Sequence, residues 1–123
     1  MKRVVLNIDL GEIPDEPEEL YALADVVNVA CGGHAGDERS MTEAVSLSAT
    51  HGCVVAAHPS YPDRAAFGRA SMAMASEALA SSIAEQCAAL ARIAATRGIV
   101  VQVDGPCPSS PGEIGRASCR ERV

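Results

Sequence analysis

Four short runs dominated by apolar, often β-branched residues limit what this chain can fold into. They span residues 3–8, 26–30, 53–57 and 99–103. The apolar residues in these runs are largely continuous rather than alternating, which is typical of parallel strands that are buried on both faces. The pattern therefore predicts four parallel strands.

Helical patterns separate several of these runs. Asp37 is the predicted N-cap of a helix that ends at Gly52, and Ser76 is the predicted N-cap of a longer helix that Gly98 stops. A short helix is expected within residues 17–24, because proline suits a first helical turn. The longer helix has a predicted buried stripe made of Leu79, Ile83, Cys87, Leu90 and Ala94. Repeated strand–helix–strand order predicts right-handed βαβ units and an α/β fold.

The charge and the cysteines exclude several classes of protein. The net charge of −6 argues against a nucleic-acid or anionic-membrane partner, since both need a basic surface. No apolar stretch approaches the length of a membrane span, and the apolar run after Met1 is too short for a signal peptide, so we expect a cytoplasmic protein. The 5 cysteines are scattered and form no CxxC pair, which indicates neither a cysteine zinc site nor a disulfide framework.

Polar side chains follow each of the first three predicted strands. They are Asp9 and Glu12, then His34 and Asp37, then His58 and Asp63. In parallel α/β folds the loops after successive strands converge at one edge, where ligands bind. Core packing does not require acids and imidazoles at three such positions, so we predict a shared functional site.

These residues are suited to catalysis or metal binding, and each has a structural alternative. Asp9 and Glu12 are candidates for a cation ligand or a general base, and the alternative is a loop cap. His34 and His58 are candidate acid–base groups or ligands, although a single histidine is often structural. Asp37 is equally well explained as a helix cap.

A second set of residues is predicted to bind substrate or phosphate. The backbone N–H groups of Gly32 and Gly33 precede a predicted helix and could hold an oxyanion. Asp63 lies in a loop stiffened by two prolines, and Arg69 could clamp a carboxylate or phosphate unless it makes only a local salt bridge. Cys31 has no evident basic partner and is a poor candidate nucleophile. The sequence has neither a P-loop nor a GxGxxG motif, so any nucleotide would need a different cradle or another subunit.

Together these motifs resemble those of the LamB/YcsF family, the A subunit of prokaryotic 5-oxoprolinase. The segments that carry the resemblance are LNIDLGE (6–12), NVACGGHAGD (28–37), AAHPSYPDR (56–64) and FGR (67–69), with a looser match over 84–98. The similarity covers roughly residues 3–103.

The resemblance implies a partial seven-stranded β/α barrel of the glycoside hydrolase/deacetylase-like kind. It also implies ATP-dependent opening of the lactam of 5-oxoproline to glutamate, with the B and C subunits as partners. The hypothetical site has Asp9, Glu12, His34, Asp37 and His58 as catalytic residues. Within it, Asp9, His34 and His58 are candidate ligands of a divalent metal ion. The alternatives are a metal-dependent deacetylase or amidohydrolase that acts without ATP, and a non-catalytic substrate-binding subunit.

Three departures from the family pattern affect this interpretation. Val5 stands where the family usually has Asp, Gly33 stands where it has Phe, and a Lys-Pro-His-Gly segment expected near Asp104 is missing. We therefore expect residues 1–103 to be the N-terminal part of a barrel. Residues 104–123 are expected to be a disordered, non-native tail produced by a frameshift and a translated sequencing adapter. Such a fragment would by itself be inactive and, with open sheet edges, poorly soluble.

Overall fold

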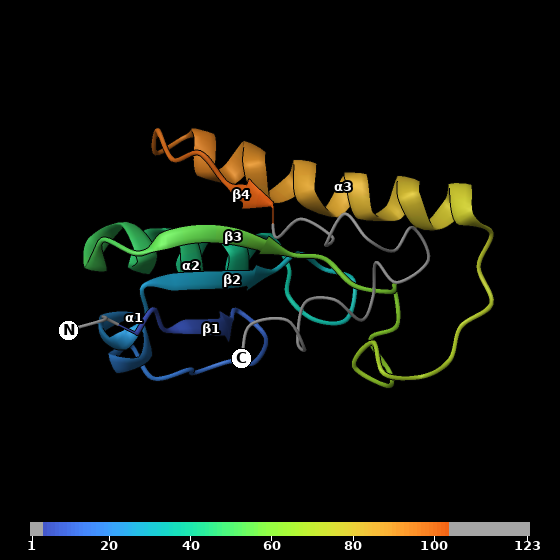
Figure 1. Cartoon of the computed structure of the whole chain (residues 1–123), viewed down its shortest axis with the longest axis horizontal. Coiled ribbons are helices and arrows are strands. Elements are labelled where there is room, and N and C mark those ends of the chain that lie inside the picture. The colour runs from blue at the N-terminus through green and yellow to red at the C-terminus, as the bar shows by residue number, and fades with distance from the viewer. Residues whose placement is uncertain (1–3, 104–123) are drawn as a thin grey trace.

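The computed structural model describes residues 4–103 and contains the predicted alternation of strands and helices (Figure 1). In chain order the elements are β1 (Asn7–Leu10), α1 (Glu19–Leu23), β2 (Val26–Ala30), α2 (Glu38–His51), β3 (Val54–His58), α3 (Ser76–Ala95) and β4 (Gln102–Val103). The predicted tail, residues 104–123, lies outside the described residues.

The four strands form one parallel sheet in the order β1-β2-β3-β4, so the predicted α/β fold with four parallel strands is confirmed. Strand β2 has the predicted bounds, and β4 is shorter than predicted. Strand β1 both begins and ends later than predicted, and β3 is shifted by one residue toward the C-terminus. Because of these shifts, Asp9 and His58 lie within strands rather than after them. Closure into a seven-stranded barrel stays a prediction.

Alternate residues along the strands face opposite sides of the sheet. One side carries Val27, Val29 and Val55, which belong to an apolar cluster shared with helices α2 and α3. From α3 this cluster takes Leu90, which is fully buried. The other side carries a lateral row of paired residues, Asp9, Asn28, Ala56 and Gln102. The helices therefore cover the apolar face, and the opposite face presents polar groups.

The ends of α2 agree with the sequence interpretation. Asp37 is the N-cap, because its carboxylate accepts a hydrogen bond from the Ser40 N–H at 2.8 Å. The Ser40 hydroxyl accepts one in return from the Asp37 N–H at 2.7 Å, which completes a capping box. Gly52 closes the helix in the left-handed conformation, with φ of 70°.

The predicted cap of α3 is wrong. Ser76 is the first residue of the helix, and the N-cap position is taken by Ala75, which makes no side-chain capping bond. On the predicted stripe Leu90 and Ala94 are buried, whereas the other three positions are partly exposed. Gln86 is buried beside that stripe at 8% exposure, which the sequence interpretation did not anticipate. Within residues 4–103 no helix has the length and apolar character needed to cross a membrane.

Candidate functional site

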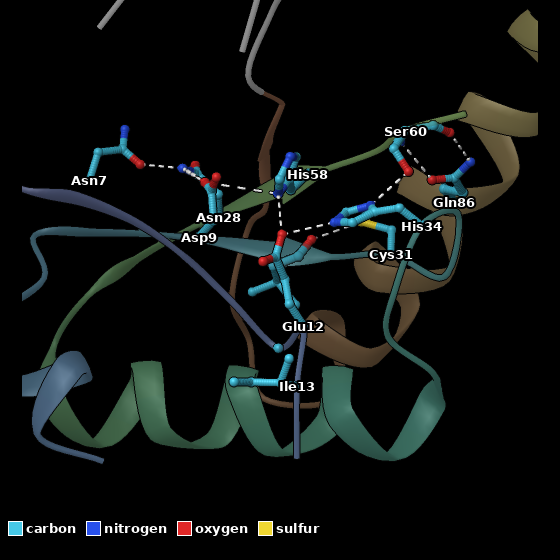
Figure 2. Close-up of polar contacts among 12 residues, drawn as sticks. Asn7, Asp9, Glu12, Ile13, Asn28, Cys31, His34, His58, Ser60 and Gln86 are labelled. Carbon is cyan, nitrogen blue, oxygen red and sulfur yellow. Dashed lines mark hydrogen bonds and ion pairs between the residues drawn. The ribbon is translucent and has the colours of Figure 1, made fainter. Parts of the chain in front are cut away.

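Three residues from successive βα units meet beyond the carboxyl ends of the strands. Glu12 follows β1, His34 lies in the loop between β2 and α2, and His58 ends β3. Glu12 Oε1 is 2.8 Å from His34 Nε2 and 3.5 Å from His58 Nδ1. We call Glu12, His34 and His58 the trio; Figure 2 shows the Glu12 carboxylate between the two imidazoles.

The trio could hold a metal ion. One ligand atom from each residue lies within 4.8 Å of the other two. Imidazole nitrogen and carboxylate oxygen are ligands that zinc accepts, and catalytic zinc sites leave a fourth position open for water or substrate. The donor set and spacing of the trio therefore fit a divalent metal ion such as zinc.

Asp9 lies beside the trio rather than at its centre. Its carboxylate is 3.8 Å from His58 Nδ1 and accepts a hydrogen bond from Asn28 Nδ2 at 2.8 Å. The same Asn28 nitrogen also donates to the side-chain oxygen of Asn7 (Figure 2). Of the predicted metal ligands, His34 and His58 thus belong to the group of close ligand atoms, in which Glu12 takes the place predicted for Asp9.

His34 is enclosed and contacted on both ring nitrogens. Its Nδ1 is 2.7 Å from the hydroxyl oxygen of Ser60, and its Nε2 faces Glu12. Its ring meets that of Phe67 edge-on, at 4.9 Å between centroids. His34 is 4% exposed, so its orientation is set by the protein rather than by solvent.

Ser60 is held in turn by Gln86 on α3. The Ser60 N–H donates to Gln86 Oε1 at 3.0 Å, and Gln86 Nε2 donates to the Ser60 carbonyl at 2.9 Å. Sequence reasoning assigned no role to either residue. One signal was present for Gln86: it lies three residues after Ile83 and four before Leu90, so it is a polar residue at the spacing of the buried stripe.

The glycine-rich segment before α2 is locked by its own hydrogen bonds. The Gly32 N–H donates to the Ala35 carbonyl at 2.8 Å, so this predicted oxyanion donor is already engaged. Arg64 Nη1 donates to the carbonyls of Gly36 at 2.8 Å and Gly32 at 3.2 Å. Gly33 is buried, and a Cβ there would lie 2.6 Å from both Gln86 Oε1 and Ser60 Oγ. The segment is shaped by contacts within the protein.

The other predicted site residues make local contacts. The pKa of Asp37 is held below its usual value, chiefly by the Ser40 N–H in the helix cap. Asp63 Oδ1 accepts a hydrogen bond from the Ala66 N–H at 3.1 Å, within its own loop. Arg69 is exposed, and its guanidinium lies 5.8 Å from the centre of the Phe67 ring. The contacts of Asp37 agree with its structural alternative as a helix cap.

Cys31 is buried next to this region but is not activated. Burial raises its pKa to about 12, and its sulfur lies 3.1 Å from the Val29 carbonyl, to which the thiol donates. A thiol with this pKa is protonated at neutral pH and is a poor nucleophile. The structure therefore agrees with the sequence interpretation of Cys31.

Comparison with known proteins places this geometry in a family. Residues 4–104 match the LamB/YcsF family. The structure is similar to that of a lactam utilization protein from Thermus thermophilus, with a TM-score of 0.76 and 34% sequence identity. The match covers 85% of this chain and 45% of that one, so this chain spans less than half the length of that protein. The chain belongs to the LamB/YcsF family.

Proposed function

We propose that the protein acts in the cytoplasm as the A subunit of an ATP-dependent 5-oxoprolinase, which opens the lactam of 5-oxoproline to L-glutamate. The observation that carries the proposal is the trio with Asp9 beside it, in a chain of the LamB/YcsF family. The similarity to a lactam utilization protein supports a cyclic amide as the substrate.

A lactam is a resonance-stabilised amide that resists water at neutral pH. Coupling to ATP overcomes this resistance if the amide oxygen is phosphorylated, because the carbon then becomes more electrophilic. Neither common nucleotide-binding motif occurs in the sequence, so ATP would need a different cradle in the protein or a site on the B or C subunit. The task of this chain is then to hold the lactam and direct water to its carbon.

Asp9 is the proposed general base. Its side chain is 38% exposed, and Asn28 fixes one of its oxygens from the neighbouring strand. Asp9 takes a proton as the water oxygen bonds to the ring carbon, and the ring C–N bond breaks. The departing nitrogen receives the proton that Asp9 took, which regenerates the Asp9 carboxylate. The acyl phosphate left at the former ring carbon loses phosphate to a second water to give L-glutamate.

The trio is the proposed site of a divalent metal ion. We assign as ligands Glu12 Oε1 and the two imidazole nitrogens that face it, His34 Nε2 and His58 Nδ1. Such an ion would polarise the carbonyl or phosphoryl oxygen next to the reacting carbon. The trio has the two-histidine, one-glutamate ligand set found in some catalytic zinc sites. This ligand set also favours a second candidate, a metal-dependent amidohydrolase or deacetylase that needs no ATP.

The test uses the intact protein together with its B and C subunits and follows ADP and glutamate formed from 5-oxoproline. We expect His34→Ala, His58→Ala and Asp9→Asn to lower kcat/KM by about 10²-fold to 10⁴-fold. His51→Ala is the matched control, since His51 pairs with Glu18 at the far end of α2, and it should leave the rate unchanged.

Zinc binding separates the proposed roles. His34→Ala and His58→Ala should lose both zinc and activity, whereas Asp9→Asn should keep zinc and lose activity. Full activity of the two histidine variants would refute the catalytic assignment. Glutamate formed without ATP, or deacetylation of acetylated sugars, would favour the second candidate.

A further inference from the structure

We infer that Ser60 and Gln86 are positioning residues that orient the His34 ring so that its Nε2 faces Glu12 and His58. This inference rests on the proposed function, because it concerns how the trio is prepared for a metal ion. It adds a connection between the trio and α3, an element that contributes no residue to the trio.

The first step is the pair of hydrogen bonds between the Gln86 side chain and the Ser60 backbone. The Ser60 backbone N–H can only donate, so the Gln86 atom 3.0 Å from it must be the oxygen. The Gln86 nitrogen then donates to the Ser60 carbonyl at 2.9 Å and to the Ser82 hydroxyl at 3.1 Å. This pair of reciprocal bonds fixes both backbone polar groups of Ser60.

The second step is the contact of Ser60 with His34. A metal ion at Nε2 requires the proton of the neutral imidazole to be on Nδ1. That N–H can donate to the Ser60 hydroxyl 2.7 Å away, and the hydroxyl can donate onward to the Tyr61 carbonyl at 3.2 Å. Hydrogen bonds of this kind fix the tautomer and the ring orientation of metal-binding histidines.

The surroundings leave this arrangement little freedom. A Cβ at Gly33 would press on Gln86 and Ser60, each at 2.6 Å. A Cβ at Gly68 would lie 2.9 Å from the His34 Cβ, and Gly68 also has a φ of +72°. Glycine at both positions therefore makes room for Ser60, Gln86 and His34 to pack closely.

The polarity of Gln86 itself supports the inference. It is 8% exposed beside the apolar stripe of a helix, where an aliphatic side chain would be the less costly choice. Within residues 4–103 its three hydrogen bonds go to Ser60 and Ser82. The hydrogen bonds to Ser60 explain why an amide is buried at this position, whereas core packing alone does not explain it.

The first measurement is the zinc affinity of the purified intact protein, by competition with a chromophoric chelator. Loss of an outer contact of this kind weakens metal binding by about 10-fold to 100-fold. We expect that loss for Ser60→Ala and Gln86→Met. Ser60→Thr, which keeps the hydroxyl, should remain within about 3-fold of the parent protein, as should Ser81→Ala, an exposed control on α3.

The second measurement does not depend on metal. NMR spectra of ¹⁵N-labelled protein report the contact between His34 and Ser60. When His34 is the donor, the signal of its Nδ1 proton reports it. When Ser60 is the donor, the ¹⁵N chemical shift of Nδ1 reports it. This signature should change in Ser60→Ala and Gln86→Met and should persist in Ser60→Thr and Ser81→Ala. The same spectra and a thermal melt show whether each variant is folded.

The outcomes separate this inference from the proposed function. Absence of zinc binding in the parent protein would refute the metal site, and the imidazole signature would still decide the positioning role. Parent-like zinc affinity and an unchanged signature in both variants would overturn the inference while leaving the metal site intact. Lost activity in folded Ser60→Ala, with both measurements unchanged, would also overturn it, because Ser60 would then act in the chemistry.

Discussion

Replacing Gly33 by alanine tests the packing around Ser60 and Gln86 directly. The added Cβ would lie 2.6 Å from Gln86 Oε1 and 2.9 Å from Gln86 Nε2, closer than Cβ atoms approach other groups. Gly33 is not among the residues with positive φ, so the cost comes from the contact and not from the backbone conformation. Overpacking of this size costs about 1–3 kcal/mol.

A double-mutant cycle makes the prediction specific. Gln86→Ala removes the bonds to Ser60 and should cost about 1–3 kcal/mol by itself. It also removes the atoms that the new Cβ would strike, although the contact with Ser60 Oγ remains. The double variant Gly33→Ala/Gln86→Ala should therefore be more stable than the sum of the two losses predicts, by about 1 kcal/mol.

The assay is urea unfolding followed by circular dichroism, with the free energy of unfolding extrapolated to water. Glu85→Ala is the matched control, because Glu85 is the exposed neighbour of Gln86 on α3. Gly33→Ala and Glu85→Ala should add within about 0.5 kcal/mol. Strict additivity of Gly33→Ala with Gln86→Ala, or no loss in Gly33→Ala, would refute the packing argument.

The remaining predictions concern the core, the helix cap and the buried thiol. Leu90→Ala should lower the free energy of unfolding by about 2–5 kcal/mol, because Leu90 is fully buried. Leu23→Ala, at an exposed position, should change it by less than about 0.5 kcal/mol. Urea unfolding midpoints of the two variants compare these losses. Asp37→Ala should lower the free energy of unfolding at neutral pH, and this loss should be smaller in acid. The folded-state pKa of Asp37 is lowered, so its contribution is complete above the unfolded value of about 3.9 and is lost as the pH falls through the folded value. A stability difference that stays constant from pH 7 to pH 3 would contradict this. Iodoacetamide at pH 8 should label Cys31 only after the protein is unfolded, because burial raises the pKa of the Cys31 thiol to about 12. Labelled Cys31 in native protein, detected by peptide mass spectrometry, would contradict this prediction.

The sequence allowed much of the fold to be predicted because local signals agreed with one another. Continuous apolar runs marked the strands, and Asp37 and Gly52 marked both ends of α2. The cap of α3 could not be identified in the same way. Ser76 has the right side chain for a cap, but the helix begins there and uses it as the first helical residue.

The exact membership of the trio depended on where β1 ends. The prediction ended this strand at residue 8, whereas it continues to Leu10. Asp9 therefore points from the sheet towards Asn28, and Glu12 lies beyond the strand end, where it reaches both imidazoles. Because β1 ends two residues later than predicted, Glu12 rather than Asp9 groups with the two histidines. Strand ends are the least certain part of a sequence-based assignment.

Ser60 and Gln86 were missed for a different reason. They are 26 residues apart, and no local pattern links them. Their contact exists because α3 packs against the apolar face of the sheet and brings Gln86 over the loop that follows β3. Such a contact depends on tertiary packing, whereas the spacing of Gln86 on the helix indicates only that a polar side chain is buried.

The order of the strands in the sheet is the order in which they are synthesised. Each new strand joins the edge left by the one before it, so no earlier pair has to separate to admit a later one. The trio and its two supports lie between Glu12 and Gln86 and come from adjacent steps of this growth. Once α3 has left the ribosome, every residue of the trio and of its two supports has been synthesised. Folding from the N-terminus can therefore bring these five residues together before the rest of the polypeptide emerges.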